Sequence, residues 1–187
     1  HLGHFALTAL LFERLASTSG ARVVNVASLA HRWTPAMDFE DFNWERKRYR
    51  KWDAYGKSKL SNLLFTFELA RRAQQAGHGV LAVAAHPGYS ATNLQMVGPQ
   101  MENSALTRVM MSMGNGLIGQ PAQMGALPTL YAATAADVES ADYIGPDGFQ
   151  QLRGFPRKVG CRRAARDPAI AQRLWTLSES LVGQRLL

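Results

Sequence analysis

The sequence is poor in cysteine and contains no long apolar run. Cys161 is the single cysteine among 187 residues, which excludes an intrachain disulfide and a multi-cysteine metal site. No apolar stretch reaches the ~18 residues that a membrane-spanning helix needs, and the first residues do not resemble a secretory signal peptide. One cysteine fits a reducing compartment, so we expect a cytoplasmic protein without a transmembrane segment.

Candidate metal ligands are scarce as well. His1 and His4 stand three residues apart on one face of a predicted helix, the spacing of a metal-binding pair. The sequence places no third ligand near them, so we expect two polar helix residues and no metal site. It also has no internal repeat, low-complexity segment or linker, which favours a single domain over residues 1–187.

The composition is that of a soluble globular protein with an excess of positive charge. Hydrophobic residues make up 47% of the chain, charged residues make up 19%, and the net charge is +7. A chain of this length can bury a sizeable core. The charge favours either an anionic partner, such as a phosphate-bearing cofactor, a membrane surface or a nucleic acid, or a surface bias that aids solubility.

Hydrophobic periodicity predicts alternating helices and strands. Two apolar runs, 21–28 and 79–86, flank a long helix over 53–76. Strand, helix and strand in this order predict a right-handed crossover between parallel strands, and therefore an α/β fold. The other expected elements are helices over 2–17 and 121–136, a short strand at 143–144, a turn at 145–148, and a last helix with Asp167 as cap and Pro168 at its first position.

Two long connections interrupt these elements. Residues 29–52 are rich in aromatic and charged side chains and include the basic run 46–51. Basic and aromatic residues together are typical of a nucleic-acid surface. Acidic residues precede the run, however, so we expect a solvated insertion beside a substrate entrance and no nucleic-acid partner. Residues 94–119 are rich in Met and Gly, with a helix expected around 103–113, and are interpreted as a lid or as hydrophobic packing.

Tyr55 and Lys59 open the helix over 53–76. Residues four apart share a helix face, and an ammonium next to a phenol favours the phenolate and lowers the phenol's pKa. Such a pair can serve as a general acid/base near neutral pH. The spacing alone favours the alternative, an exposed lysine beside a half-buried tyrosine.

Polar groups follow the carboxyl ends of both predicted parallel strands, where ligands bind in open α/β sheets. Ser28 ends the first strand, and Pro87, Gly88 and Thr92 follow the second. Gly88 permits close approach of the backbone to a ligand, and Thr92 offers a hydroxyl. Alternatively, Ser28 closes its strand by bonding local backbone, and the residues after the second strand form an ordinary turn.

These motifs, in this order on these elements, resemble the short-chain dehydrogenase/reductases. The motifs are Asn-Val-Ala-Ser28 at a strand end, Tyr55-x-x-x-Lys59 on the next helix, and His86-Pro87-Gly88 after the next strand. The opening His-Leu-Gly-His-Phe, the stretch 143–156 and the long insertion before Tyr55 look most like the retinol dehydrogenase-like branch. The resemblance extends over essentially the whole chain. It implies the C-terminal part of a Rossmann-type, doubly wound parallel sheet in three α/β/α layers.

The resemblance also implies an NAD(P)-dependent oxidoreductase that interconverts a small apolar alcohol and its aldehyde or ketone by hydride transfer. Tyr55 would exchange a proton with the substrate oxygen. Lys59 would lower the pKa of that phenol and bind the nicotinamide ribose, and Ser28 would orient the substrate. The backbone of Pro87 and Gly88, together with Thr92, would hold the nicotinamide end of NADP or NAD, with NADP slightly favoured.

The chain departs from the family pattern at its beginning. The family's glycine-rich turn, Gly-x-x-x-Gly-x-Gly, is absent, and the looser match at 114–119 follows a Met-rich loop rather than a strand, so it is interpreted as a chance match. The asparagine of the family's catalytic tetrad would fall just before His1. The sheet would lack its first four strands, leaving residues 21–28 as an exposed edge. We therefore expect the C-terminal portion of a protein of ordinary length.

The family resemblance further implies a homo-oligomer in which helices 2–17 and 53–76 pair subunits as a four-helix bundle. The alternative to an enzyme is a non-catalytic truncated fragment that acts only as an association surface through these helices. Cofactor binding distinguishes the two, because the fragment would show none.

Overall fold

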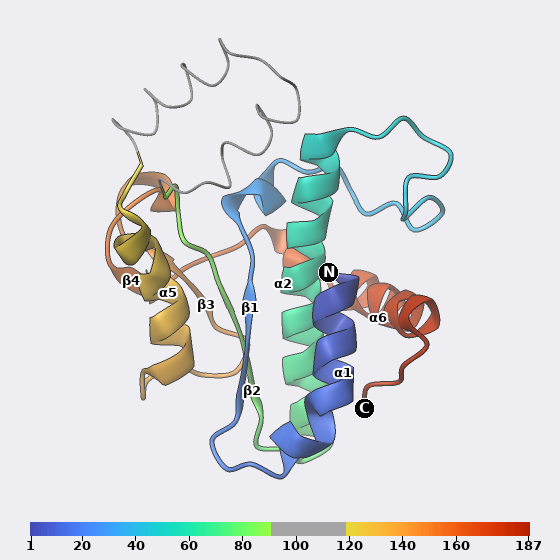
Figure 1. Cartoon of the computed structure of the whole chain (residues 1–187), viewed down its shortest axis with the longest axis horizontal. Coiled ribbons are helices and arrows are strands. Elements are labelled where there is room, and N and C mark those ends of the chain that lie inside the picture. The colour runs from blue at the N-terminus through green and yellow to red at the C-terminus, as the bar shows by residue number, and fades with distance from the viewer. Residues whose placement is uncertain (91–118) are drawn as a thin grey trace.

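The computed structural model describes residues 1–90 and 119–187 (Figure 1). The predictions made for Thr92, for the lid over 94–119, for the helix at 103–113 and for the glycine pattern at 114–119 lie wholly or largely outside the described residues. The described elements are α1 (Leu2–Ala16), β1 (Arg22–Val26), η1 (Leu29–Arg32), α2 (Lys51–Gln75), β2 (Leu81–Ala85), α5 (Ala122–Thr134), β3 (Tyr143–Pro146), η2 (Phe149–Gln151), β4 (Pro156–Lys158), η3 (Arg163–Arg166) and α6 (Pro168–Val182).

Within residues 1–90 and 119–187, the sheet has four strands in the order β1-β2-β3-β4. β1 and β2 are parallel and pair from Arg22↔Leu81 to Val26↔Ala85, so their carboxyl ends lie side by side. β3 is also parallel to β2, whereas β4 runs antiparallel to β3. The predicted α/β fold with a parallel sheet is confirmed.

The far edge of the sheet differs from the sequence prediction. β4 was not among the predicted strands, because Pro-Arg-Lys shows no alternation of apolar and polar side chains. It pairs Gly145 with Arg157 and Pro146 with Pro156. These pairs extend β3 through two residues that the sequence assigns to a turn.

Helices cover both faces of the sheet (Figure 1). α1 and α2 lie on one face and α5 lies on the other, while α6 forms a further layer over α1 and α2. An aromatic cluster joins α1, α2 and α6. The Trp175 ring centroid lies 5.2 Å from that of Phe5 and 5.8 Å from that of Phe65. The middle of α2, residues 60–66, is buried as a result.

The ends of α6 follow the capping signals in the sequence. The Asp167 carboxylate accepts hydrogen bonds from the backbone N–H groups of Ala169 and Ile170, and Gly183 ends the helix with φ +68°. α2 begins at Lys51, two residues before the predicted start.

α1 presents an apolar strip to the surface. Leu7, Leu10 and Leu11 are 60%, 68% and 48% exposed, and their spacing puts them on one side of the helix. Contiguous exposed leucines mark an interaction surface more often than a solvated one. In the described part of the chain, no helix is both long and apolar enough to cross a membrane.

Candidate active site

Ser28 lies directly beyond β1 and begins the 3₁₀ turn η1. Its Oγ accepts a hydrogen bond from the N–H of Ala30 at 3.2 Å, and its backbone is extended. Its carbonyl oxygen lies 2.6 Å from His31 Nδ1. The local bond uses a lone pair of Oγ and leaves the hydroxyl proton as a donor, so the geometry suits both a strand-closing serine and a substrate-orienting one.

Lys59 connects α2 to the end of β1. Its Nζ donates to the carbonyl oxygen of Val26 at 3.4 Å, two residues before Ser28, and Asn62 Nδ2 donates to the same oxygen at 3.1 Å. The Lys59 ammonium lies 5.6 Å from the centroid of the Tyr55 ring, within the range of a cation–π contact. Burial lowers the pKa of the Lys59 ammonium. The predicted pair therefore shares one helix face and stands at the end of the strand that leads to Ser28.

Gly56 makes this approach possible. A Cβ at this position would lie 2.8 Å from the Thr34 Cβ and 3.0 Å from the carbonyl oxygen of Ala30. A side chain would therefore push α2 away from η1. Sequence reasoning assigned no role to Gly56; its place inside the Tyr-Gly-Lys motif was the available signal.

The Pro87–Gly88 turn is bonded extensively within the chain. The N–H of Gly88 donates to His86 Nδ1 at 3.2 Å, and the Pro87 carbonyl accepts from Gln120 Nε2 at 2.8 Å. Gly88 has φ +68°, and a Cβ there would lie 2.4 Å from the carbonyl oxygen of Leu152. Its backbone thus closely approaches its own chain, which requires glycine whether or not a ligand binds.

A buried aromatic and histidine cluster lies behind the strand ends, and sequence reasoning did not identify it. The Tyr143 ring centroid lies 5.8 Å from that of His31 and 5.1 Å from that of His86. Burial lowers the pKa of His86 to about 4 and also lowers the pKa of His31, while burial raises the pKa of the Tyr143 phenol. All three side chains are therefore neutral near pH 7. The position of each histidine just beyond a strand end was the available signal.

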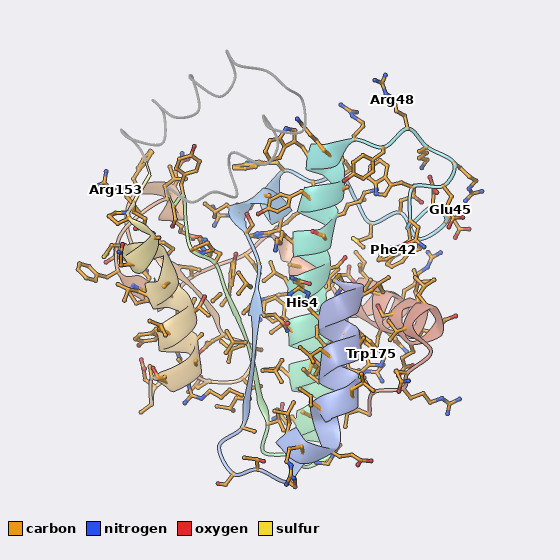
Figure 2. All side chains as sticks on the ribbon, viewed as in Figure 1. His4, Phe42, Glu45, Arg48, Arg153 and Trp175 are labelled. Atoms are coloured by element: carbon orange, nitrogen blue, oxygen red, sulfur yellow. The ribbon has the colours of Figure 1, made fainter. Side chains whose placement is uncertain are left out.

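The basic segment 46–51 belongs to a loop organised by acidic side chains. The Asp41 carboxylate accepts the backbone N–H groups of Glu45, Arg46 and Lys47, and Lys47 forms an ion pair with Asp38. Arg48 points outward from this loop (Figure 2). The acidic residues thus partly neutralise the run, as the interpretation of a solvated insertion requires.

Among the residues that the model describes, no group of three or more His, Cys, Asp or Glu side chains is arranged to hold a metal ion. His1 Nε2 instead lies 2.8 Å from Ser178 Oγ, in contact with α6.

The fold and the order of motifs along it resemble those of the short-chain dehydrogenase/reductases. No family model matches it. Its similarity to individual proteins is nevertheless clear: it is 39% identical over 184 residues to retinol dehydrogenase 13 of Mus musculus, covering 98% of this chain and 52% of that protein. It is 38% identical to retinol dehydrogenase 12 of Homo sapiens, covering 99% of this chain and 53% of the relative. The predicted resemblance to the retinol dehydrogenase-like branch is confirmed.

A solved structure shows the same fold. The crystal structure of an uncharacterised protein from Mycobacterium paratuberculosis is 41% identical in sequence and superposes with a TM-score of 0.77, covering 100% of this chain and 58% of that one. The chain thus spans about half the length of the curated relatives it matches.

Proposed function

We propose that this chain is the catalytic part of an NAD(P)-dependent oxidoreductase that interconverts a small apolar alcohol and its aldehyde or ketone. The observation that carries the proposal is the placement of Tyr55 and Lys59 on one face of α2, where the Lys59 ammonium donates to the carbonyl of Val26, two residues before Ser28. Similarity to relatives named retinol dehydrogenases supports it.

In this proposal each side chain has one task. The Tyr55 phenol gives a proton to the substrate oxygen in reduction and takes it back in oxidation. The Lys59 ammonium stabilises the negative charge that forms on the phenol, and partial burial strengthens that interaction. The Ser28 hydroxyl donates to the substrate oxygen and orients it.

The donors of Lys59 suit a nicotinamide ribose. The Lys59 ammonium carries three N–H groups. Within the described residues it forms a single long hydrogen bond, to the carbonyl of Val26. The remaining N–H groups are therefore available to bind the hydroxyl groups of a ribose. NADP or NAD would supply or accept the hydride, and the net charge of +7 favours a phosphate-bearing cofactor. Pro87 and Gly88 would contribute a rigid contact surface, because the Gly88 N–H and the Pro87 carbonyl are already bonded within the chain.

The proposal is tested with the full chain, NADPH or NADH, and retinal as the carbonyl probe. We expect Tyr55→Phe to reduce turnover by about 100-fold or more, with cofactor affinity nearly unchanged. Tyr49→Phe is the matched control, because Tyr49 is 63% exposed and contacts the Trp44 ring. Turnover that survives in Tyr55→Phe would refute the acid/base assignment.

The second candidate function, an association surface, has its own supporting observation in the exposed leucines of α1. Because α6 and the sheet bury residues 60–66 of α2, we propose α1 as the principal contact of a homo-oligomer. Leu10→Glu should then release monomers in sedimentation velocity, and an unchanged assembly would refute this contact. We also retain a cytoplasmic location as a proposal.

A further inference from the structure

Two consecutive residues near the candidate site adopt a backbone conformation that residues other than glycine rarely adopt. Gln150 and Gln151, in η2, have φ +49° and +62°. Non-glycine residues in the left-handed region carry strain, and such strain persists where the surrounding structure requires it. Gln150 is exposed, whereas Gln151 is partly buried and points its amide into the protein.

The Gln151 amide oxygen accepts two hydrogen bonds from elements far apart in the sequence. Arg32 Nη2 donates to Oε1 at 2.9 Å, and His86 Nε2 lies 3.2 Å from the same oxygen. Arg32 ends the turn that Ser28 begins, and His86 immediately precedes Pro87. One oxygen atom thus joins the two turns that follow β1 and β2.

The protonation of His86 follows from its neighbours. The backbone N–H of Gly88 can only donate, so His86 Nδ1 is its acceptor at 3.2 Å and carries no proton. The proton of the neutral ring is therefore on Nε2 and is donated to Gln151. A continuous chain of hydrogen bonds runs from Arg32 through Gln151 and His86 to the amide of Gly88.

The residue after Gln151 reinforces the same connection. The carbonyl oxygen of Leu152 accepts the N–H of Tyr89 at 2.6 Å, in addition to its close approach to Gly88. On the other side, Arg32 also donates to the carbonyl of Gly160 at 3.3 Å. The strained segment is therefore held against both turns.

We propose that Gln151 is a positioning residue that fixes the separation between the Ser28 turn and the Pro87–Gly88 turn, and so aligns the substrate oxygen with the nicotinamide. Its catalytic consequence rests on the proposed function, but the bridge itself does not. If Gln151 bridges the two turns, replacing its amide oxygen should disturb the Ser28 turn and the Pro87–Gly88 turn together. If it is only a surface glutamine, the replacement should disturb neither turn.

The bridge is tested first without activity, by comparing Gln151→Glu with Gln150→Glu in the full chain. Both variants add one negative charge to η2, but only Gln151→Glu places the carboxylate within hydrogen-bond distance of His86 Nε2. His31 and Arg32 also face His86 and are the same in both variants. An NMR titration should show the pKa of His86 raised by about one unit or more in Gln151→Glu and by less in Gln150→Glu. Equal shifts in the two variants would overturn the bridge.

Kinetics with NADPH and retinal then test positioning, using Gln151→Leu and Gln150→Leu. The two variants replace neighbouring residues in the same backbone region, so the cost of a branched residue there is matched. We expect Gln151→Leu to lower kcat about tenfold and to raise the KM for NADPH, with Gln150→Leu near the wild type. Gln151→Glu keeps the acceptor oxygen and should restore most of kcat near neutral pH.

The outcomes separate the two proposals. Equal kinetic constants for the two leucine variants would overturn positioning while the oxidoreductase stands. A wild-type chain without turnover would refute the proposed function, and the His86 titration would still decide whether the bridge exists.

Discussion

Gly56 of α2 lies so close to Thr34 that a Cβ added to the glycine would be 2.8 Å from the Thr34 Cβ. Real Cβ atoms do not approach this closely, so any side chain at residue 56 separates α2 from the segment that follows η1. Because residue 55 is its neighbour on the helix, the separation would move Tyr55 relative to Ser28. The absence of a side chain at residue 56 is thus a requirement of the site as well as of packing.

Gly56→Ala should therefore reduce turnover by about tenfold and lower the free energy of unfolding by about 1–2 kcal/mol, because overpacking outweighs the better helix propensity of alanine. Gly3→Ala is the matched control. It also lies within a helix, but nothing stands within 4 Å of its added Cβ, so it should stabilise the chain by about 0.5–1 kcal/mol. Urea unfolding and initial rates measure the two effects. Equal stabilisation by both substitutions would contradict the predicted clash.

Gly88→Ala should lower the free energy of unfolding for two separable reasons. The backbone has φ +68°, and the Cβ would lie 2.4 Å from the carbonyl oxygen of Leu152. Gly77 shares the first property, with φ +73°, but has nothing within 4 Å. We expect Gly77→Ala to destabilise the chain by about 1 kcal/mol and Gly88→Ala by about 3 kcal/mol or more. If chemical denaturation gives the same loss for both, the contact with Leu152 is not tight.

Local signals in the sequence predict the elements well, because each signal depends on neighbouring residues. The apolar runs identify β1 and β2, and the Asp167-Pro168 pair identifies the start of α6. Their order then predicts the parallel pairing that places Ser28 and Pro87 beyond neighbouring strand ends. The general location of the candidate site therefore follows from the sequence.

The contacts that hold the site depend on residues far apart in the chain. Gln151 is 119 residues from Arg32 and 65 from His86, and a glutamine follows no hydrophobic period that would indicate its partner. The sequence assigns to Gly88 a close approach to a ligand, whereas the neighbour that the structure shows is the Leu152 carbonyl, which the sequence cannot identify. β4 escapes prediction for a similar reason, since three polar or proline residues become a strand only by pairing with β3.

His86 should make the chain less stable in acid. Its folded-state pKa is lowered to about 4 from 6.5, chiefly by burial, so folding favours the neutral ring. The stabilising contribution is complete above pH 6.5 and is lost as the pH falls toward 4. It amounts to about 3 kcal/mol from the size of the shift. His31 and Arg32, which face the ring from η1, act in the same direction.

This pH dependence is measured by urea unfolding at a series of pH values between 4 and 7. His86→Asn keeps an acceptor for the Gly88 N–H but does not titrate, so its free energy of unfolding should fall less steeply than that of the wild type. His78→Asn, at a partly exposed position that contacts the Phe12 ring, is the control for replacing a histidine elsewhere in the chain. A wild-type slope that persists in His86→Asn would assign the acid sensitivity to other groups.

Tyr143→Phe should stabilise the chain. The Tyr143 side chain is 1% exposed, and its hydroxyl is buried without a hydrogen-bond partner among the residues that the structure covers. A buried, unpaired hydroxyl costs about 1–3 kcal/mol, whereas phenylalanine keeps the ring contacts with His31 and His86. We therefore expect the free energy of unfolding to rise by about 1 kcal/mol, measured by thermal and urea unfolding. Tyr131→Phe removes a hydroxyl that donates to Asp137 at 2.6 Å and should not stabilise. A loss of stability in Tyr143→Phe would show that this hydroxyl has a hydrogen-bond partner.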